Sequence, residues 1–251
     1  MSSKKRNLAR FGMAAKGTVY SLIGILTGLA AFGEGGKTTG SKGALQYLAT
    51  LSYGKVLLII LGLGLLGYVF WRMYQSFGNP KGLSDDFKGY AKRVAYFISG
   101  IIYGLLAIYA FKLGLDRFSG SNSGTLGDHG DTIAILVGFG LAIKAIYDFY
   151  RAYSGKFREE VEEAGMSNKE QTVLVNAGRF GHTARGLVLG IMAYLTLKSG
   201  FEGTNINTQT DAFGYIESEY GSLVLGIIAI GLLCYGIYMF IMAKYPSISV
   251  S

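Results

Sequence analysis

Residues 10–32 read RFGMAAKGTVYSLIGILTGLAAF, and residues 53–74 read YGKVLLIILGLGLLGYVFWRMY. Each stretch is apolar for about 20 residues, the length that an α-helix needs to cross a hydrocarbon core of ~30 Å. A connection rich in Gly, Thr and Lys separates the two stretches. Residues 10–77 are therefore predicted to form a hairpin of two membrane-spanning helices.

The rest of the chain repeats this pattern. Half of the 251 residues are hydrophobic, and the chain has 38 Gly but only 2 Pro, as is typical of closely packed membrane helices. Six apolar blocks can be delimited: Phe11–Phe32, Gly54–Phe77, Ala91–Leu113, Thr132–Tyr153, Gly181–Leu197 and Gly221–Ala243. They predict an all-α integral membrane protein with six transmembrane helices in a single membrane domain, residues 1–251.

The six blocks form three related pairs. The motif RFG at residues 10–12, followed by Lys16, recurs as RFG at residues 179–181, followed by Arg185; a looser copy places Ser99 at the same position. The repeats span residues 10–77, 91–153 and 179–245. Since each repeat has two spans, all three share one orientation, which predicts three tandem hairpins with pseudo-threefold symmetry about the membrane normal.

Small residues four apart are kept in the first helix of each repeat, and such pairs allow close helix packing. We interpret them as contacts between hairpins: Gly17 and Ser21, Gly100 and Gly104, and Gly186 and Gly190. In the second helices, Trp71, Tyr147 and Tyr238 hold corresponding positions. They are interpreted as part of an interfacial aromatic belt, with an aromatic ligand box as the alternative.

Two kinds of local helix are also expected. An amphipathic segment at residues 44–54 corresponds to one at residues 212–221, and each predicts a short helix on the outer surface. Ser167 and Glu170 have the spacing of a capping box, which predicts a short helix leading into the fifth span.

The net charge of +8 is unevenly distributed. Lys and Arg concentrate at the two termini and in the connections that follow Phe77 and Tyr153. By the positive-inside rule these parts are cytoplasmic, so both termini lie in the cytoplasm. The charge is therefore interpreted as an orientation signal with attraction to anionic lipids at the cytoplasmic face, and not as a nucleic-acid surface.

The entry motif, the segment Gly-Ala-Leu at residues 43–45 and the exit GLLGYVFWR at residues 64–72 resemble the family called domain of unknown function 1206. That family is described as a pair of membrane helices occurring three times per protein. The resemblance covers about Arg10 to Tyr245 and implies a bacterial protein of the cytoplasmic membrane. It implies no activity and no catalytic residues.

Charged residues inside spans are costly, at about 2.5–3.5 kcal/mol near mid-helix on insertion scales. Lys16, Ser99 and Arg185 hold equivalent positions near the cytoplasmic boundary. Facing a common axis, they would form a basic ring for an anion or a lipid phosphate. The alternative is that Lys16 and Arg185 extend along the surface to reach the head groups.

Lys144 and Asp148 lie four apart, hence on one helix face. One interpretation is a buried ion pair that holds helices together. The other is a gate or an ion relay, with Asp128, His129 and Asp131 gathering cations at the outer mouth. In either case these residues, where Tyr68 and Arg72 stand in the first repeat, are the clearest departure from the repeated pattern.

The sequence carries no enzyme signature, cofactor motif or metal site. The predicted topology places His129 and His182 on opposite sides of the membrane, and the glycine motifs lie inside spans. Two function hypotheses remain: a channel or transporter for a small ion or solute, and a non-transporting scaffold, lipid-binding module or subunit of a larger complex. The oligomeric state is left open.

The topology can be checked by labelling. A cysteine introduced at Ser121, with Cys234 replaced by alanine, should react with a membrane-impermeant maleimide on intact cells, because the predicted loop is external. Labelling that requires inverted vesicles would contradict the topology.

Overall fold

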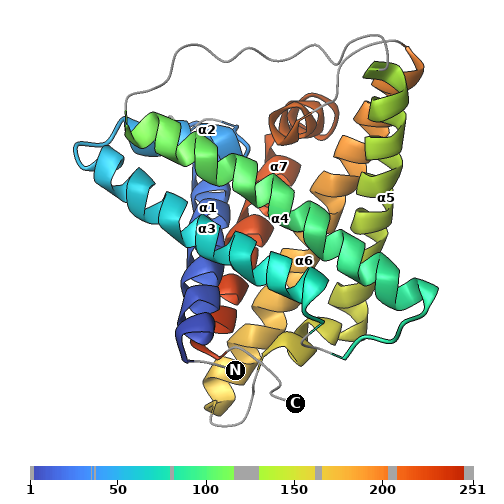
Figure 1. Cartoon of the computed structure of the whole chain (residues 1–251). Coiled ribbons are helices and arrows are strands. Elements are labelled where there is room, and N and C mark those ends of the chain that lie inside the picture. The colour runs from blue at the N-terminus through green and yellow to red at the C-terminus, as the bar shows by residue number, and fades with distance from the viewer. Residues whose placement is uncertain are drawn as a thin grey trace.

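The computed structural model describes residues 3–34, 36, 38–79, 82–115, 130–161, 166–202 and 208–245. Its elements are α1 (Ser3–Ala31), α2 (Ser41–Ala49), α3 (Gly54–Phe77), α4 (Phe87–Gly114), α5 (Gly130–Ser154), the 3-10 helix η1 (Lys156–Glu160), α6 (Asn168–Phe201) and α7 (Gln209–Lys244) (Figure 1). No strand forms within these ranges, so the all-α prediction is confirmed.

Among the described residues, four stretches are long and apolar enough to cross a membrane: Asn7–Ala31, Gly54–Phe77, Gly89–Gly114 and Gln209–Lys244. Helices α5 and α6 have 25 and 34 residues but carry the charged side chains Lys144, Asp148 and Arg185. Large apolar side chains such as Leu105 and Ile146 are exposed along the long helices. The chain is therefore a multi-pass helical membrane protein.

The long helices pack in the order α4–α3–α1–α7–α6–α5. Helices α1 and α3 form one packed hairpin, and α6 and α7 form another. Helices α4 and α5, expected to form the hairpin of residues 91–153, are not among the packed pairs of the described residues; α4 packs on α3, and α5 packs on α6 (Figure 1). In the sequence, a glycine-rich connection joins these two helices.

Close backbone contacts shape the two packed hairpins in the same way. A Cβ added at Gly12 would collide with the backbone of Tyr68, and one added at Gly181 would collide with the backbone of Tyr235. Likewise, Gly64 is pressed against Ala15, as Gly231 is against Ala184. Glycine at these positions lets two helix backbones approach without intervening side chains.

The two short helices are confirmed as α2 and as the part of α7 that precedes Gly221, and their place on the outer side stays a prediction. Helix α2 buries Ala44, Leu45 and Leu48, and the first part of α7 buries Ala212, Phe213 and Ile216. At Gly221 the backbone has φ 81° and ψ 167°, which favours glycine and bends α7 into its membrane-spanning part. The two outer helices meet where the Gly40 amide donates to Thr210 Oγ1 at 3.1 Å.

The capping box at Ser167 and Glu170 is confirmed, but α6 runs without a break from Asn168, so the expected short helix and the fifth span are one helix. The Glu170 carboxylate also accepts hydrogen bonds from Lys244 Nζ at 2.8 Å and from Tyr245 Oη at 2.9 Å. These bonds, that from Lys244 above all, lower the pKa of Glu170 to about 2. Glu170 thus ties the start of α6 to the end of α7.

The Glu170→Gln variant should unfold at a lower temperature than the native protein at pH 7. Because the pKa of Glu170 is lowered on folding, its stabilising effect is complete above pH 4.5, its ordinary pKa, and is lost as the pH falls toward 2. Thermal unfolding in detergent at pH 7 and pH 3 measures both effects. Lys169→Gln is the matched control. If both substitutions lowered the unfolding temperature equally, Glu170 would not be the residue that links α6 to α7.

A basic cluster and a tyrosine cage in the protein core

Asp148 on α5 is fully buried and faces three nitrogen-bearing side chains. Lys144 Nζ, one turn earlier on α5, donates to Asp148 Oδ1 at 2.5 Å. From α6, Arg185 Nη1 lies 3.3 Å from Asp148 Oδ2, and His182 Nδ1 lies 3.4 Å from Oδ1. Since His182 and Arg185 are three apart, they share one face of α6. The carboxylate therefore joins α5 to α6.

Arg185 extends this network to two further helices. Its Nε donates to Tyr20 Oη on α1 at 3.1 Å, and its Nη1 donates to Tyr235 Oη on α7 at 3.1 Å. Its guanidinium carbon lies 5.0 Å from the centre of the Tyr235 ring. The side chain of Arg185, which belongs to α6, thus contacts groups on three other helices: α1, α5 and α7.

Lys16 lies in a tyrosine cage, the rings of Tyr20, Tyr68, Tyr103 and Tyr235, which come from α1, α3, α4 and α7. The ring centres are 5.0–5.9 Å from its Nζ. Nζ also donates to Tyr68 Oη at 3.3 Å. Cation–π contacts contribute roughly 0.5–2 kcal/mol each, more where water is excluded. Only 3% of Lys16 is exposed, so this side chain does not run along the surface to the head groups.

Lys16 and Arg185 are brought together through shared tyrosines, since both lie within 6 Å of the rings of Tyr20 and Tyr235. Ser99, the third member of the predicted basic ring, is half-buried on α4. From α4, Tyr103 takes its place beside Lys16. Of the three equivalent positions, two thus supply a cation to the core, whereas from α4 it is Tyr103, four residues after Ser99, that contacts Lys16.

His182 and the tyrosine cage were not predicted. His182 is fully buried, and its ring centre lies 5.2 Å from that of Tyr235 and 5.3 Å from that of Tyr238. Among the described residues, its Nε2 has no hydrogen-bond partner and its Nδ1 has only the 3.4 Å contact with Asp148 Oδ1. The sequence does hold a signal for these residues. Tyr68 and Tyr235 occupy the position that Lys144 holds in the middle repeat, and His182 lies one turn before Arg185, so all three are placed beside the predicted charged residues.

The remaining candidates are placed as follows. Gly17 and Ser21 face Gly236 of α7, Gly100 and Gly104 face Met73 and Val69 of α3, and Gly186 and Gly190 face Phe149 and Ala145 of α5. Each small pair thus lies where helices of different repeats meet. Asp128 and His129 fall outside the described residues, as does the side chain of Asp131.

The aromatic belt needs a correction. Trp71 and Tyr238 are buried, and of the three corresponding residues only Tyr147 is well exposed. Tyr238 Oη donates to the Phe157 carbonyl at 2.9 Å and accepts from Arg151 Nη2 at 3.3 Å. The belt prediction is therefore wrong for Trp71 and Tyr238, because corresponding sequence positions do not ensure that a residue faces lipid.

The cluster gathers three basic side chains around one carboxylate. Within the described ranges, no group of three or more His, Cys, Asp or Glu residues is arranged to hold a metal ion. Two positive charges, on Lys144 and Arg185, share the single negative charge of Asp148. With Lys16 nearby, the core carries an excess of positive charge and hydroxyl donors, which suits an anion.

Comparisons with known proteins agree with this architecture. The sequence model described as Domain of Unknown Function (DUF1206) matches residues 11–78 and again residues 180–245, which correspond to the two packed hairpins. The chain is similar to the uncharacterized protein YxxB of Bacillus subtilis (strain 168), with 28% identity over 250 residues, covering 96% of this chain and 90% of that protein. No solved structure matches.

Asp148→Asn should destabilise the fold by about 3–5 kcal/mol, the cost of breaking a buried ion pair, because Arg185 and Lys144 lose their shared carboxylate. Lys144→Met should cost much less, since the Lys144 side chain is 39% exposed and Asp148 keeps Arg185. Denaturant unfolding in detergent, followed by circular dichroism, measures both. If both variants lost the same unfolding free energy, the ion pair of Asp148 with Lys144, and not that with Arg185, would be the main source of stability.

Proposed function

The chain belongs to the family described as Domain of Unknown Function (DUF1206), and from this premise we propose that it is a six-span membrane protein whose basic core binds a small ion on a pathway across the bilayer. The ion is an anion. Lys16 and Arg185 set selectivity, and Lys144 and Asp148 form the gate.

The topology part of the proposal places both termini in the cytoplasm, in a bacterial cytoplasmic membrane. The start of α1 and the end of α7 lie at the same end of the helices, which supports an even number of spans (Figure 1). The lengths of α5 and α6 support six spans, and the corresponding glycine contacts of the two packed hairpins support a relation between two of the three proposed pairs. In this arrangement the α4–α5 pair is the one that departs from threefold symmetry.

The burial of the basic cluster among apolar helices is the observation that carries the proposal. Each charge inside a span costs about 2.5–3.5 kcal/mol on insertion scales, so several basic groups gathered in one place favour a function over mere packing. Nε2 of His182 also lacks a hydrogen bond among the described residues, and its Nδ1 has only the 3.4 Å contact with Asp148 Oδ1. Such atoms supply further contacts for an ion or its water.

The gate follows from the unequal exposure of its two members. Asp148 is fully buried, whereas the Lys144 side chain is 39% exposed at the edge of the cluster. Lys144 is therefore the member that can leave without unpacking the core. Its departure leaves Asp148 paired with Arg185 and opens the cluster on that side.

A second function is favoured by the packing of the core itself. Lys16 is 3% exposed and enclosed by four tyrosine rings, an arrangement that equally suits a static, charge-stabilised core. The chain would then be a non-transporting scaffold, a lipid-binding module or a subunit of a larger complex. In both readings it acts without enzymatic chemistry or a cofactor, and its partners are lipids and, for the first, an anion.

Flux into proteoliposomes tests the pathway. Vesicles that contain the native protein should take up chloride faster than empty vesicles, and Lys16→Met should lower this uptake. Lys144→Ala and Asp148→Ala both break the pair at the gate, so both should change the rate. The matched control is Lys112→Ala, an exposed lysine near the end of α4.

Uptake no faster than that of empty vesicles, for chloride and for several other ions, would refute the pathway and leave the second function. Co-purification then tests the second function in turn. A monodisperse monomer without bound lipid or partner subunit would argue against the scaffold.

A further inference from the structure

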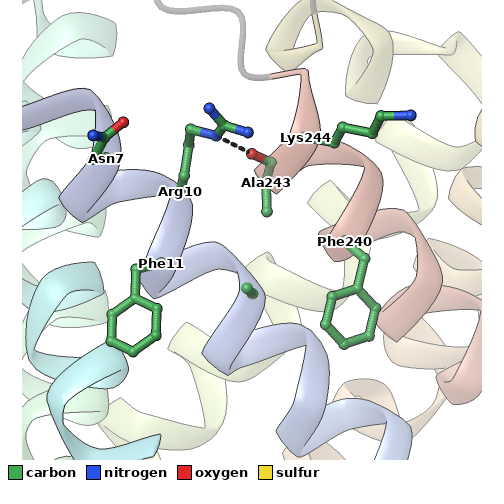
Figure 2. A pocket seen from close by; sticks show the side chains of 7 residues that line it. Asn7, Arg10, Phe11, Phe240, Ala243 and Lys244 are labelled. Carbon is green, nitrogen blue, oxygen red and sulfur yellow. Dashed lines mark hydrogen bonds between the residues drawn. The ribbon is translucent and has the colours of Figure 1, made fainter. Parts of the chain in front are cut away.

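A shallow, open groove lies between α1 and α7 at the end of the helices where both chain termini lie. Its volume is about 440 Å³. The lining residues are Asn7, Arg10, Phe11, Ala14, Phe240, Ala243 and Lys244 (Figure 2). In the sequence, the apolar block of α1 begins at Phe11, directly after Arg10, and that of α7 ends at Ala243, directly before Lys244. The groove therefore lies at the boundary between lipid and water.

Arg10 is held across the mouth of the groove. Its Nε donates to the carbonyl oxygen of Ala243, in the last turn of α7, at 2.8 Å. Figure 2 shows this bond, to which neither of the two terminal guanidinium nitrogens contributes. Among the described residues, this bond is the one that orients the group, and the terminal nitrogens have a geometry suited to two oxygens of a phosphate.

Below Arg10 the lining becomes apolar. Phe11 and Phe240 project from facing helices, and 44% and 41% of their surfaces are exposed (Figure 2). Deeper still the helices converge at Gly17, where an added Cβ would lie 3.1 Å from the Gly236 carbonyl oxygen and 3.3 Å from Phe240 Cε1. The groove therefore narrows toward the membrane centre and changes from polar to apolar with depth.

We propose that this groove binds one phospholipid with an anionic head group. The phosphate lies on Arg10 and Asn7, and an acyl chain runs over Phe11, Ala14 and Phe240. The order of polar and apolar groups along the groove is that of a phospholipid at a membrane surface, and basic grooves between membrane helices suit anionic head groups. Lys244 adds positive charge at the rim, although its amine is already paired with Glu170. The proposal does not depend on the ion pathway.

The chain offers a matched control for Arg10. Arg179 holds the corresponding position on α6, in the second copy of the RFG motif, and is also exposed. Within the described part of the chain, no hydrogen bond links Arg179 to α5 as Arg10 is linked to α7. An effect of general surface charge should therefore appear at both arginines, and an effect of the groove only at Arg10.

Native mass spectrometry of the full-length protein in detergent, with equal amounts of phosphatidylglycerol and phosphatidylcholine, provides the test. The native protein should retain one phosphatidylglycerol in preference to phosphatidylcholine. Arg10→Gln should reduce this retention roughly tenfold or more, the effect of losing one charge-assisted contact, and Arg179→Gln should leave it unchanged. Asn7→Asp, on an exposed side chain, should also reduce it by placing a negative charge beside the phosphate, and it serves if Arg10→Gln does not fold.

A parallel measurement of thermal unfolding distinguishes a lipid phosphate from free inorganic phosphate as the ligand. Phosphatidylglycerol should raise the unfolding temperature of the native protein, and inorganic phosphate at the same concentration should not. Equal retention of the two lipids, unchanged retention in both Asn7→Asp and Arg10→Gln, or equal stabilisation by inorganic phosphate would each overturn the proposal.

Discussion

The carboxylate of Asp148 and the positive groups around it are the constraint on which the rest of the core depends. A buried carboxylate without partners would cost several kcal/mol, so α5 must lie where Arg185 of α6 can reach it. Arg185 in turn holds the hydroxyls of Tyr20 and Tyr235 and thereby relates α6 to α1 and α7. Those same two tyrosines form half of the cage around Lys16. A single negative charge thus organises groups from four of the six long helices.

Close backbone packing is what makes this arrangement possible. Without a hydrophobic driving force between helices in lipid, association depends on van der Waals contact and on polar contacts, and both need short distances. Gly12 and Gly181 let their helices lie against the backbones of Tyr68 and Tyr235, the residues whose side chains enter the cage. The glycines and the tyrosines therefore act together. Each glycine allows a short distance between two helices, and at that distance the tyrosine places its hydroxyl and its ring beside a cation.

The candidate site was predictable only in part. The pairing of Lys144 with Asp148 follows from their spacing of four on one helix, and the importance of Lys16 and Arg185 follows from charge inside an apolar block. The burial of His182 beside Asp148 and the four tyrosines around Lys16 could not be derived in the same way, because they come from different helices. Trp71 and Tyr238 illustrate the limit: their positions correspond to that of Tyr147, yet they are buried and Tyr147 is not.

By itself, the sequence determined the features that rest on neighbours along the chain: the long apolar helices, the short outer helices, the capping box at Ser167 and the pairing across one helical turn. Only the tertiary structure decided which faces of the helices meet, that α4 packs on α3 and not on α5, and that two cations share tyrosines at the core. The physical reason is that local patterns depend on hydrogen bonds and spacings within a few residues. The rotation of one membrane helix against another depends on the packing of both surfaces at once.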